Sequence, residues 1–527
     1  MDSSNLAEAG PRAGRREWTG LAVLALPTLL LALDLSVLYL ALPQLSADLG
    51  ASSTQQLWIA DIYGFMIAGF LVTMGTVGDR VGRRKLLMIG ACAFGVTSVL
   101  AAYSPTAETL VVTRALLGVA GATLMPSTLA LISNMFKDPK QRAVAIGAWL
   151  SCFLGGTAIG PLVGGVLLEF FWWGSVFLLG VPVMVLLLVT APILLPEYRA
   201  PEAGRLDLVS VGMSLATILP IVYGLKELAQ GGLAVVPVAA LAIGLLVGVA
   251  FVARQRRLSD PLVDVRLFRN RNFRAAFTVV LLGGITIGGI AMLFAQYLQL
   301  VEGMPAMTAG LWMLPHTLAM IVGSMLAPAL AQQVRPAYLV AGGLVLSAIG
   351  YLLLTQVQAT GGLTVTVIGM CLAYFGFAPG AVLSTDLIVG SAPPEKAGSA
   401  SSLSETSGEL SVALGIAVLG SVLAAVYRGQ IADTLPAATP PGVAEAARDA
   451  LVAVTAEAQR LPADLAGTVL ESARAAFTGG LNVVGVVCAV TMALLAVLAV
   501  ALLKDVRPGA ESEQDAEAAT PVAASEG

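Results

Sequence analysis

The sequence predicts an all-α membrane protein with fourteen transmembrane helices, on three observations. Of its 527 residues, 57% are apolar and only 12% are charged, which is more apolar surface than a soluble domain can bury. The apolar residues gather in runs of at least about 18 residues, a length that crosses the hydrocarbon core of a bilayer as a helix. Lysine and arginine are concentrated in alternate loops between these runs.

The fourteen predicted spans fall into groups of six, two and six. The first six are expected at 19–42, 55–78, 85–103, 107–134, 141–168 and 174–195. The next two are expected at 207–226 and 233–253, and the last six at 274–299, 306–332, 337–355, 361–389, 397–427 and 478–503. We therefore expect two six-helix bundles, at 19–195 and 274–503, with a helix pair inserted in the segment 196–273.

The distribution of cations predicts which loops face the cytoplasm. With the N-terminus inside, the inner loops and both tails hold 23 of the 29 lysines and arginines, and short basic loops resist translocation. We expect a multi-pass protein of a bacterial cell membrane, with cytoplasmic tails at 1–18 and 504–527, the second of them acidic and disordered. The long outer loop at 428–477 contains amphipathic stretches that predict a small helical hairpin, with a disordered loop as the alternative.

Between the second and third spans lies a short turn, GTVGDRVGRRK, that is both basic and rich in glycine. Its glycines allow two helices to approach closely, and its aspartate can pair with an arginine or cap the next helix. An ordinary cytoplasmic loop would explain the cations but not the placement of the glycines and the aspartate. We expect this turn to gate the inner face through Gly75, Asp79, Arg80, Gly82 and Arg83.

The fifth span, GAWLSCFLGGTAIGPLVGG, carries a stripe of small residues with one proline. Such a helix packs closely against its neighbours and bends at the proline. Generic helix packing would explain the glycines alone, but their order around the proline is more specific. We expect Gly156, Gly160, Pro161 and Gly164 to take part in conformational gating.

Three charged residues of the first bundle are predicted to lie at the same depth in the membrane. A charge inside a span costs about 2.5–3.5 kcal/mol on insertion scales, so each needs a reason to be there. Counting about 1.5 Å per residue places Asp34, Asp61 and Arg114 roughly 9–12 Å below the outer surface. We expect a cluster in which at least one acid binds and releases protons; the alternative is a static ion pair that only fixes helix packing.

Two further acids, Glu405 and Glu409, lie in the thirteenth span. They are four residues apart, so they share one helix face, and both are expected near the middle of the membrane. We expect this pair to bind substrate, unless one of them only faces a cytoplasmic vestibule.

Five stretches of the chain resemble the fourteen-span drug/proton antiporters of the major facilitator superfamily, the branch with the Qac-type quaternary ammonium efflux pumps. They are LDLSVLYLALPQLSADL, WIADIYGFMIAGF with its basic turn, RALLGVAGA, the span-five stripe, and the thirteenth-span run from AGSAS to LGIAVLGS. The resemblance implies that Asp34 and Asp61 handle drug and protons, that Arg114 couples them, and that the two span-thirteen glutamates recognise cationic drugs. It also implies that the span-five stripe is an antiporter signature, which uptake symporters generally lack.

The tenth span departs from some Qac-type pumps, because it lacks their acid and carries His316, the sole histidine of the chain. The histidine is either a polar packing residue or a residue that couples protons or binds substrate. Four aromatic residues are candidates for cation–π contacts with a substrate, although each could also pack in the core or at the membrane interface. They are Trp58, Tyr63, Tyr297 and Trp312.

These residues together predict a proton-coupled antiporter that exports lipophilic, mostly cationic drugs such as quaternary ammonium compounds, dyes and antiseptics. The alternative is export of one endogenous metabolite or a self-made antibiotic. An enzyme is not expected, since one histidine and four scattered cysteines provide no metal or triad site. The expected partners are small-molecule substrates, protons and the lipid bilayer, with no cofactor, no metal and no nucleic acid, and the protein is expected to be a monomer.

Overall fold

The computed structural model describes residues 12–51, 53–199, 207–231, 234–258, 261–392, 397–436, 438–449, 451–458 and 461–503. Within these ranges the chain forms helices and connecting loops and contains no strand. Fourteen of the helical segments are long and apolar enough to span a membrane, which confirms the number predicted from the sequence.

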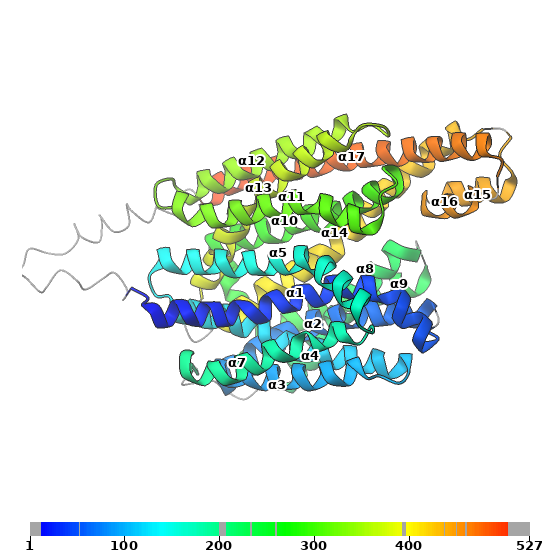
Figure 1. Ribbon diagram of the computed structural model, residues 1–527. Coiled ribbons are helices and arrows are strands. Elements are labelled where there is room, and N and C mark those ends of the chain that lie inside the picture. The colour runs from blue at the N-terminus through cyan, green and yellow to red at the C-terminus, as the bar shows by residue number, and fades with distance from the viewer. Residues whose placement is uncertain are drawn as a thin grey trace, which may run out of the picture.

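The first bundle is built from the N-terminal helices, which lie in the lower half of Figure 1. They are α1 (Arg15–Leu49), α2 (Ser53–Val81), α3 (Arg83–Ala102), α4 (Ala107–Met135), α5 (Pro139–Phe170), α6 (Ser175–Leu178) and α7 (Gly180–Leu194). Local sequence determines several starts: the Thr106 side chain accepts a hydrogen bond from the backbone N–H of Thr109 at the start of α4, and Asp138 caps α5 in the same way, with Pro139 at its first position. The helices bury one shared apolar core that runs from Leu21 to Leu195 and also reaches Val389.

The second bundle lies above the first in Figure 1 and has its own apolar core. Its spans are α10 (Arg271–Gln296), α11 (Ala306–Leu330), α12 (Pro336–Leu353), α13 (Leu363–Gly390), α14 (Ala397–Thr434) and α17 (Ala463–Leu503). Three short segments adjoin two of these helices: the 3-10 turn η1 (Val265–Arg269) precedes α10, the π turn η2 (Tyr297–Val301) follows it, and the 3-10 turn η3 (Leu354–Gln356) follows α12.

Both α14 and α17 extend beyond the predicted spans 397–427 and 478–503. Their extensions carry a small helical hairpin, α15 (Pro441–Asp449) and α16 (Leu451–Ala458), which lies at the right of Figure 1. The hairpin is attached by packing and by a hydrogen bond of 2.8 Å from the Tyr427 hydroxyl to the carbonyl of Ala447. Hydropathy alone underestimates the length of these two helices, because their Ala-rich polar ends remain helical beyond the end of the apolar run.

The inserted pair, α8 (Leu208–Gly231) and α9 (Val235–Gln255), lies beside the contact between the two bundles. Val222 of α8 packs on Phe65 and Ala68 of α2, and Leu225 packs on α14. Helix α9 turns apolar side chains outward, among them Val236, Leu245, Leu246 and Val249, as expected for a helix that faces lipid.

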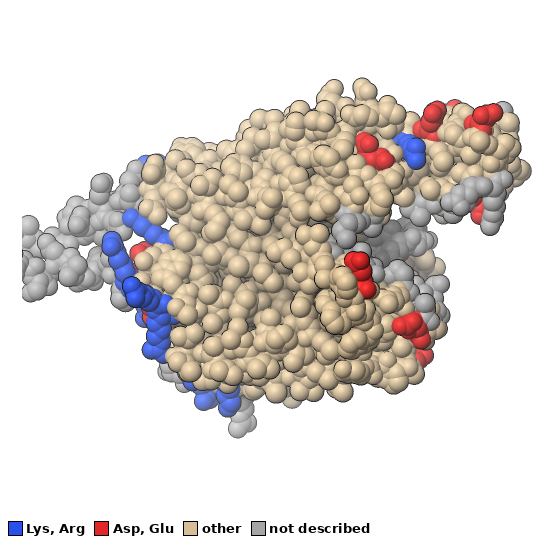
Figure 2. Space-filling model, viewed as in Figure 1, with Lys and Arg blue, Asp and Glu red and all other residues tan. Residues whose placement is uncertain are grey.

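Charged side chains separate along the length of the molecule. Figure 2 shows lysine and arginine gathered at one end, and acidic side chains mostly at the other. The cation-rich end, here called the basic end, holds the turn between α2 and α3 and the start of α5.

Candidate functional site

A buried ion pair lies inside the first bundle, between α1 and α4. The Nη1 atom of Arg114, on α4, lies 2.6 Å from the Oδ2 atom of Asp34, on α1. The Arg114 side chain is fully buried, whereas 11% of the Asp34 side chain is exposed. Truncating one partner of a buried pair strands the other charge, at a cost of about 3–5 kcal/mol. The aspartate is therefore both held in place and open to an approaching proton or cation.

The Arg114 guanidinium is held on two further sides by α2 and by aromatic rings. Its Nε donates to the carbonyl of Ile59 over 3.3 Å. Its central carbon lies 4.4 Å from the centre of the Tyr63 ring and 5.8 Å from that of Phe177. Neither its Nη2 nor the Tyr63 hydroxyl has a hydrogen-bond partner among the described residues. Two polar groups beside the aspartate can therefore still form hydrogen bonds.

The structure brings Asp34 and Arg114 together, but it does not describe the third predicted member of the cluster. The side chain of Asp61 lies outside the described residues, although its backbone belongs to α2, two residues after Ile59. Its role in binding protons or substrate stays a prediction.

The two glutamates of α14 lie in the other bundle and are both half-buried. Glu405 and Glu409 interact electrostatically with each other, and Glu409 also acts electrostatically on Tyr63. Helix α14 packs directly on α2, which carries Tyr63, and on α4, which carries Arg114.

The small-residue stripe of α5 lies where this helix packs closely against its neighbours. A Cβ atom at Gly156 would overlap the carbonyl of Leu29 on α1, and one at Gly164 would come within 2.8 Å of Val37. Farther toward the basic end, the same helix meets the second bundle, where a Cβ at Gly147 would lie 2.9 Å from the carbonyl of Ser324 on α11. Gly160 is buried, and the Pro161 side chain lies outside the described residues. The glycines explain close packing, while their part in gating stays a prediction.

At the basic end, the last turns of α2 join the two bundles. Asp79 forms a buried ion pair with Arg83, and its Oδ2 accepts a hydrogen bond of 3.2 Å from the backbone N–H of Ser399 in the first turn of α14. The nearby Thr76 hydroxyl lies 3.5 Å from that of Ser399. A carboxylate at a helix N-terminus is favoured by the free N–H groups and the helix dipole. The aspartate therefore stabilises contact between α2 and α14.

Gly82 is required by the geometry of this turn. Its φ of +116° lies in a region that residues with a Cβ rarely adopt. A Cβ there would also come within 2.6 Å of Glu197, which accepts hydrogen bonds from the backbone N–H groups of Arg84 and Lys85. Gly75 is buried and Arg80 is half-buried in the last turns of α2.

Sequence reasoning did not select a second contact between the bundles at this end. The Nε atom of Arg142, on α5, lies 2.6 Å from the Oδ1 atom of Asp386, on α13. Both side chains are largely buried, with 20% and 15% exposed. The sequence offers little to predict this contact, because the arginine lies in a basic loop and the acid lies near the inner end of an apolar run, 244 residues away.

The structure places the predicted aromatic residues and the histidine in different surroundings. Trp58 and Trp312 are each 39% exposed. Tyr297, by contrast, is fully buried in the core of the second bundle, where its hydroxyl donates to Glu302 over 2.6 Å. His316 is 3% exposed, and its ring centre lies 4.5 Å from that of Tyr374. Tyr297 therefore packs inside the second bundle, and its contact with substrate stays a prediction.

Comparison with known proteins identifies the family. The family model described as Major Facilitator Superfamily matches residues 24–416. The chain is 43% identical over 491 residues to the multidrug efflux pump LfrA of Mycolicibacterium smegmatis, covering 93% of this chain and 97% of the relative. It is 35% identical over 470 residues to the methyl viologen resistance protein SmvA of Salmonella typhimurium, covering 88% and 93%.

The solved structure of the human organic anion transporter MFSD10 shares the fold, with a TM-score of 0.59 and 16% identity, over 92% of this chain and 99% of that one. The predicted fold class and family are thus confirmed, and the relatives are transporters, not enzymes. With fourteen apolar helices and a family match that covers most of them, this multi-pass membrane protein belongs to the Major Facilitator Superfamily.

Proposed function

We propose that this chain is a proton-coupled antiporter that exports lipophilic, mostly cationic drugs from the cytoplasm or the inner leaflet. Its substrates would be quaternary ammonium compounds, dyes and antiseptics. The observation that carries the proposal is the Asp34–Arg114 pair inside the first bundle, in which Arg114 belongs to a helix that packs on α14. The names of the relatives, a multidrug efflux pump and a methyl viologen resistance protein, support export of drugs.

The coupling follows from competition for carboxylate charge. A cation between the bundles is attracted by ionised Glu405 and Glu409 and can lie against an aromatic face. Binding of a proton to Asp34 weakens its attraction to Arg114 and changes how α1 and α4 hold together. The carboxylates of Asp34, Glu405 and Glu409 together therefore serve drug and proton by turns, as an exchanger requires.

The orientation belongs to the same proposal. Placing the basic end in the cytoplasm puts most of the lysines and arginines inside, as the positive-inside rule requires. Both tails would then be cytoplasmic. The contacts of Asp79 with Ser399 and of Arg142 with Asp386 would close the inner face. The protein would work as a monomer, because each chain contains both bundles and the site between them.

Transport in proteoliposomes with an imposed pH gradient tests the function, with ethidium and tetraphenylphosphonium as substrates. Asp34→Asn should abolish uphill export of both, because the amide cannot take up and release the coupling proton. Asp48→Asn, on the exposed end of the same helix, is the matched control and should transport like wild type. Undiminished uphill export by a folded Asp34→Asn protein would refute the proposed coupling.

A further inference from the structure

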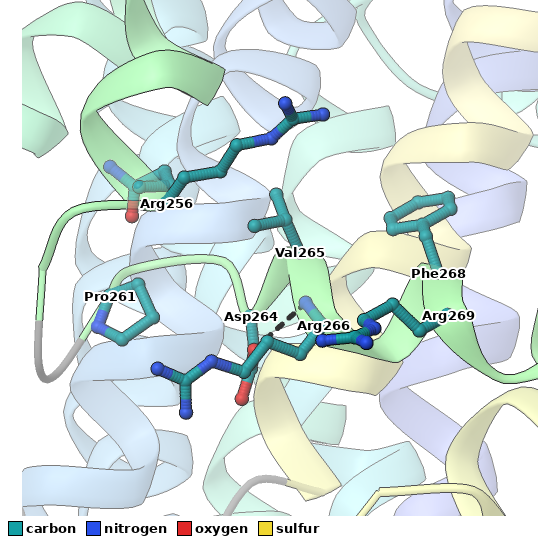
Figure 3. Close-up of a pocket in the computed structure, with 8 residues that line it drawn as sticks. Arg256, Pro261, Asp264, Val265, Arg266, Phe268 and Arg269 are labelled. Atoms are coloured by element: carbon teal, nitrogen blue, oxygen red, sulfur yellow. Dashed lines mark hydrogen bonds between the residues drawn. The ribbon is translucent and has the colours of Figure 1, made fainter.

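A pocket separate from the central site opens at the basic end, at the junction between α9 and the second bundle. It has a volume of about 420 Å³ and is drawn in Figure 3. Eight residues line it: Gln255, Arg256, Pro261, Asp264, Val265, Arg266, Phe268 and Arg269. None of them takes part in the site proposed for drug and protons.

The charge of the pocket is strongly positive. Arg256 extends from the end of α9, and Arg266 and Arg269 extend from η1. No ion pair engages these three side chains among the described residues. The single acid of the lining, Asp264, accepts a hydrogen bond of 3.0 Å from the backbone N–H of Arg266. The lining therefore has three cations against one acid that also caps η1.

Within the part of the chain that the structure describes, the neighbouring Arg254–Asp207 pair does not compensate this excess. Arg254, two residues before Arg256, lies 2.8 Å from Asp207 and forms an ion pair with it. Hydrogen bonds from Ser210 and Arg254 hold the pKa of the Asp207 carboxyl below its ordinary value. That aspartate is therefore ionised at neutral pH and satisfied by its own arginine, and the pocket arginines are left for another anion.

The pocket is held in shape by a buried glutamine. The Gln255 side chain, 1% exposed, accepts hydrogen bonds from the backbone N–H groups of Leu262 and Val263 over 2.7 and 3.3 Å. Its amide nitrogen donates to the Ser210 hydroxyl over 2.8 Å. A ligand therefore meets a preformed wall and does not have to order the loop first.

The apolar surroundings favour a lipid over a free anion. The pocket lies at the end of α9, whose exposed valines and leucines form an outward apolar face. Phe268, Val265 and Pro261 add apolar surface beside the guanidinium groups. Arginine matches the geometry of phosphate oxygens with paired hydrogen bonds. We propose that this pocket binds the phosphate headgroup of an anionic phospholipid in the leaflet at the basic end.

Such a lipid would also act on the contact between the bundles. The carbonyl of Leu262, in the loop that walls the pocket, accepts a hydrogen bond of 3.1 Å from the Thr76 hydroxyl on α2. Thr76 in turn lies beside Ser399 of α14. Holding the loop in place therefore stabilises the arrangement in which α2 and α14 meet at the basic end.

Binding can be measured on the full-length protein in detergent by native mass spectrometry and thermal unfolding. The probe is dioleoylphosphatidylglycerol, with dioleoylphosphatidylcholine as the neutral lipid. The variant Arg256→Gln/Arg266→Gln/Arg269→Gln should lose about tenfold or more in affinity for the anionic lipid, since each cation near an anionic headgroup contributes to attraction. The control, Arg12→Gln/Lys137→Gln/Arg257→Gln, removes three exposed cations of the basic end that lie outside the pocket and should bind like wild type.

Unfolding midpoints in the absence of lipid should match among the three proteins, which shows that the pocket variant is folded. Equal affinity of the pocket variant and the control for the anionic lipid would overturn the proposal. Inorganic phosphate tests the other source of the same chemistry: if it binds the wild type and displaces the lipid at millimolar concentration, the site takes a free anion and the lipid assignment is wrong.

Discussion

At the scale of residues, the protein keeps charges where a membrane protein should have few. The charge of Arg114 is stabilised there by the Asp34 carboxylate, the Ile59 carbonyl and the Tyr63 ring. The two glutamates of α14 are half-buried and repel each other when both are ionised. A pair of like charges in low dielectric gains from a proton or from a cation. This difference suggests that the ion pair organises the site and that the glutamates take the cation.

The glutamates should therefore release protons when a monovalent cationic drug binds. Ionised carboxylates are favoured beside a cation, and linked equilibria are reciprocal. Replacing both glutamates with glutamine should lower the affinity for cationic drugs about ten- to a hundredfold, because a hydrogen bond to a charged group contributes about 1.5–3 kcal/mol. The affinity for neutral drugs should change little. Proton release is measured in weakly buffered detergent solution as the drug is added.

The matched control replaces Glu445 and Glu471, which are exposed in the hairpin region, with glutamine. It should release as many protons as wild type. Absence of release from wild type, or equal release from Glu405→Gln/Glu409→Gln, would show that these two residues do not carry the coupling.

At the scale of elements, the turn between α2 and α3 works through its connections. Gly82 permits the sharp change of direction, Asp79 reaches across to α14, and Glu197 holds the first turn of α3. The charge of the aspartate serves two groups at once, the Arg83 guanidinium and the N-terminus of α14. No drug-binding residue is involved, so a change here should alter movement and not recognition.

Asp79→Asn should slow turnover several-fold and leave drug affinity within about twofold of wild type. The amide of asparagine still accepts a hydrogen bond, but it cannot form the ion pair with Arg83. It also loses the attraction of a negative charge to the helix dipole, which contributes about 0.3–1 kcal/mol. Initial export rates and equilibrium binding of ethidium give the two quantities. Asp138→Asn is the control, since Asp138 caps α5 within one bundle and asparagine caps equally well. A large loss of affinity with normal turnover would contradict a gating role.

At the scale of the whole molecule, two separately packed bundles meet along α2 with α14 and α5 with α11. The polar contacts described between them lie toward the basic end: Asp79 with Ser399, Arg142 with Asp386, and Ser151 with Ser324 over 2.9 Å. Few such contacts are needed, because each bundle is stable through its own core. Rocking of one bundle against the other can therefore break them without unfolding either.

The Arg142–Asp386 pair should help to hold the basic end together. In a cysteine-free background, spin labels at Lys137 and Gln333, which belong to different bundles and are exposed, report the separation of the bundles. Arg142→Gln should shift the distance distribution to larger values. The exchanged pair Arg142→Asp/Asp386→Arg should restore part of the short-distance population, because it reverses the charges but keeps the attraction. A distribution that does not change in Arg142→Gln would rule the pair out as a latch.

The sequence by itself determined the features that depend on local physics. The number of spans follows from the length of apolar runs, and the basic turn is visible because its glycines, acid and cations are adjacent in the chain. A buried charge is conspicuous in an apolar run, so Asp34 and Arg114 could be selected as partners before their 2.6 Å contact was seen. The equal depth of the two residues followed from the rise of a helix.

Only the tertiary structure decided which distant residues meet. Asp386 lies opposite Arg142, and Leu262 lies against Thr76, because helices far apart in sequence are neighbours in space. Tyr297 was predicted together with the other aromatic residues as a possible substrate contact, and only the fold shows that it is buried inside the second bundle. The arginine pocket forms from two segments that carry no shared motif. Local patterns in the sequence determine where a helix lies in the membrane. Tertiary packing determines which face of the helix contacts which neighbouring helix.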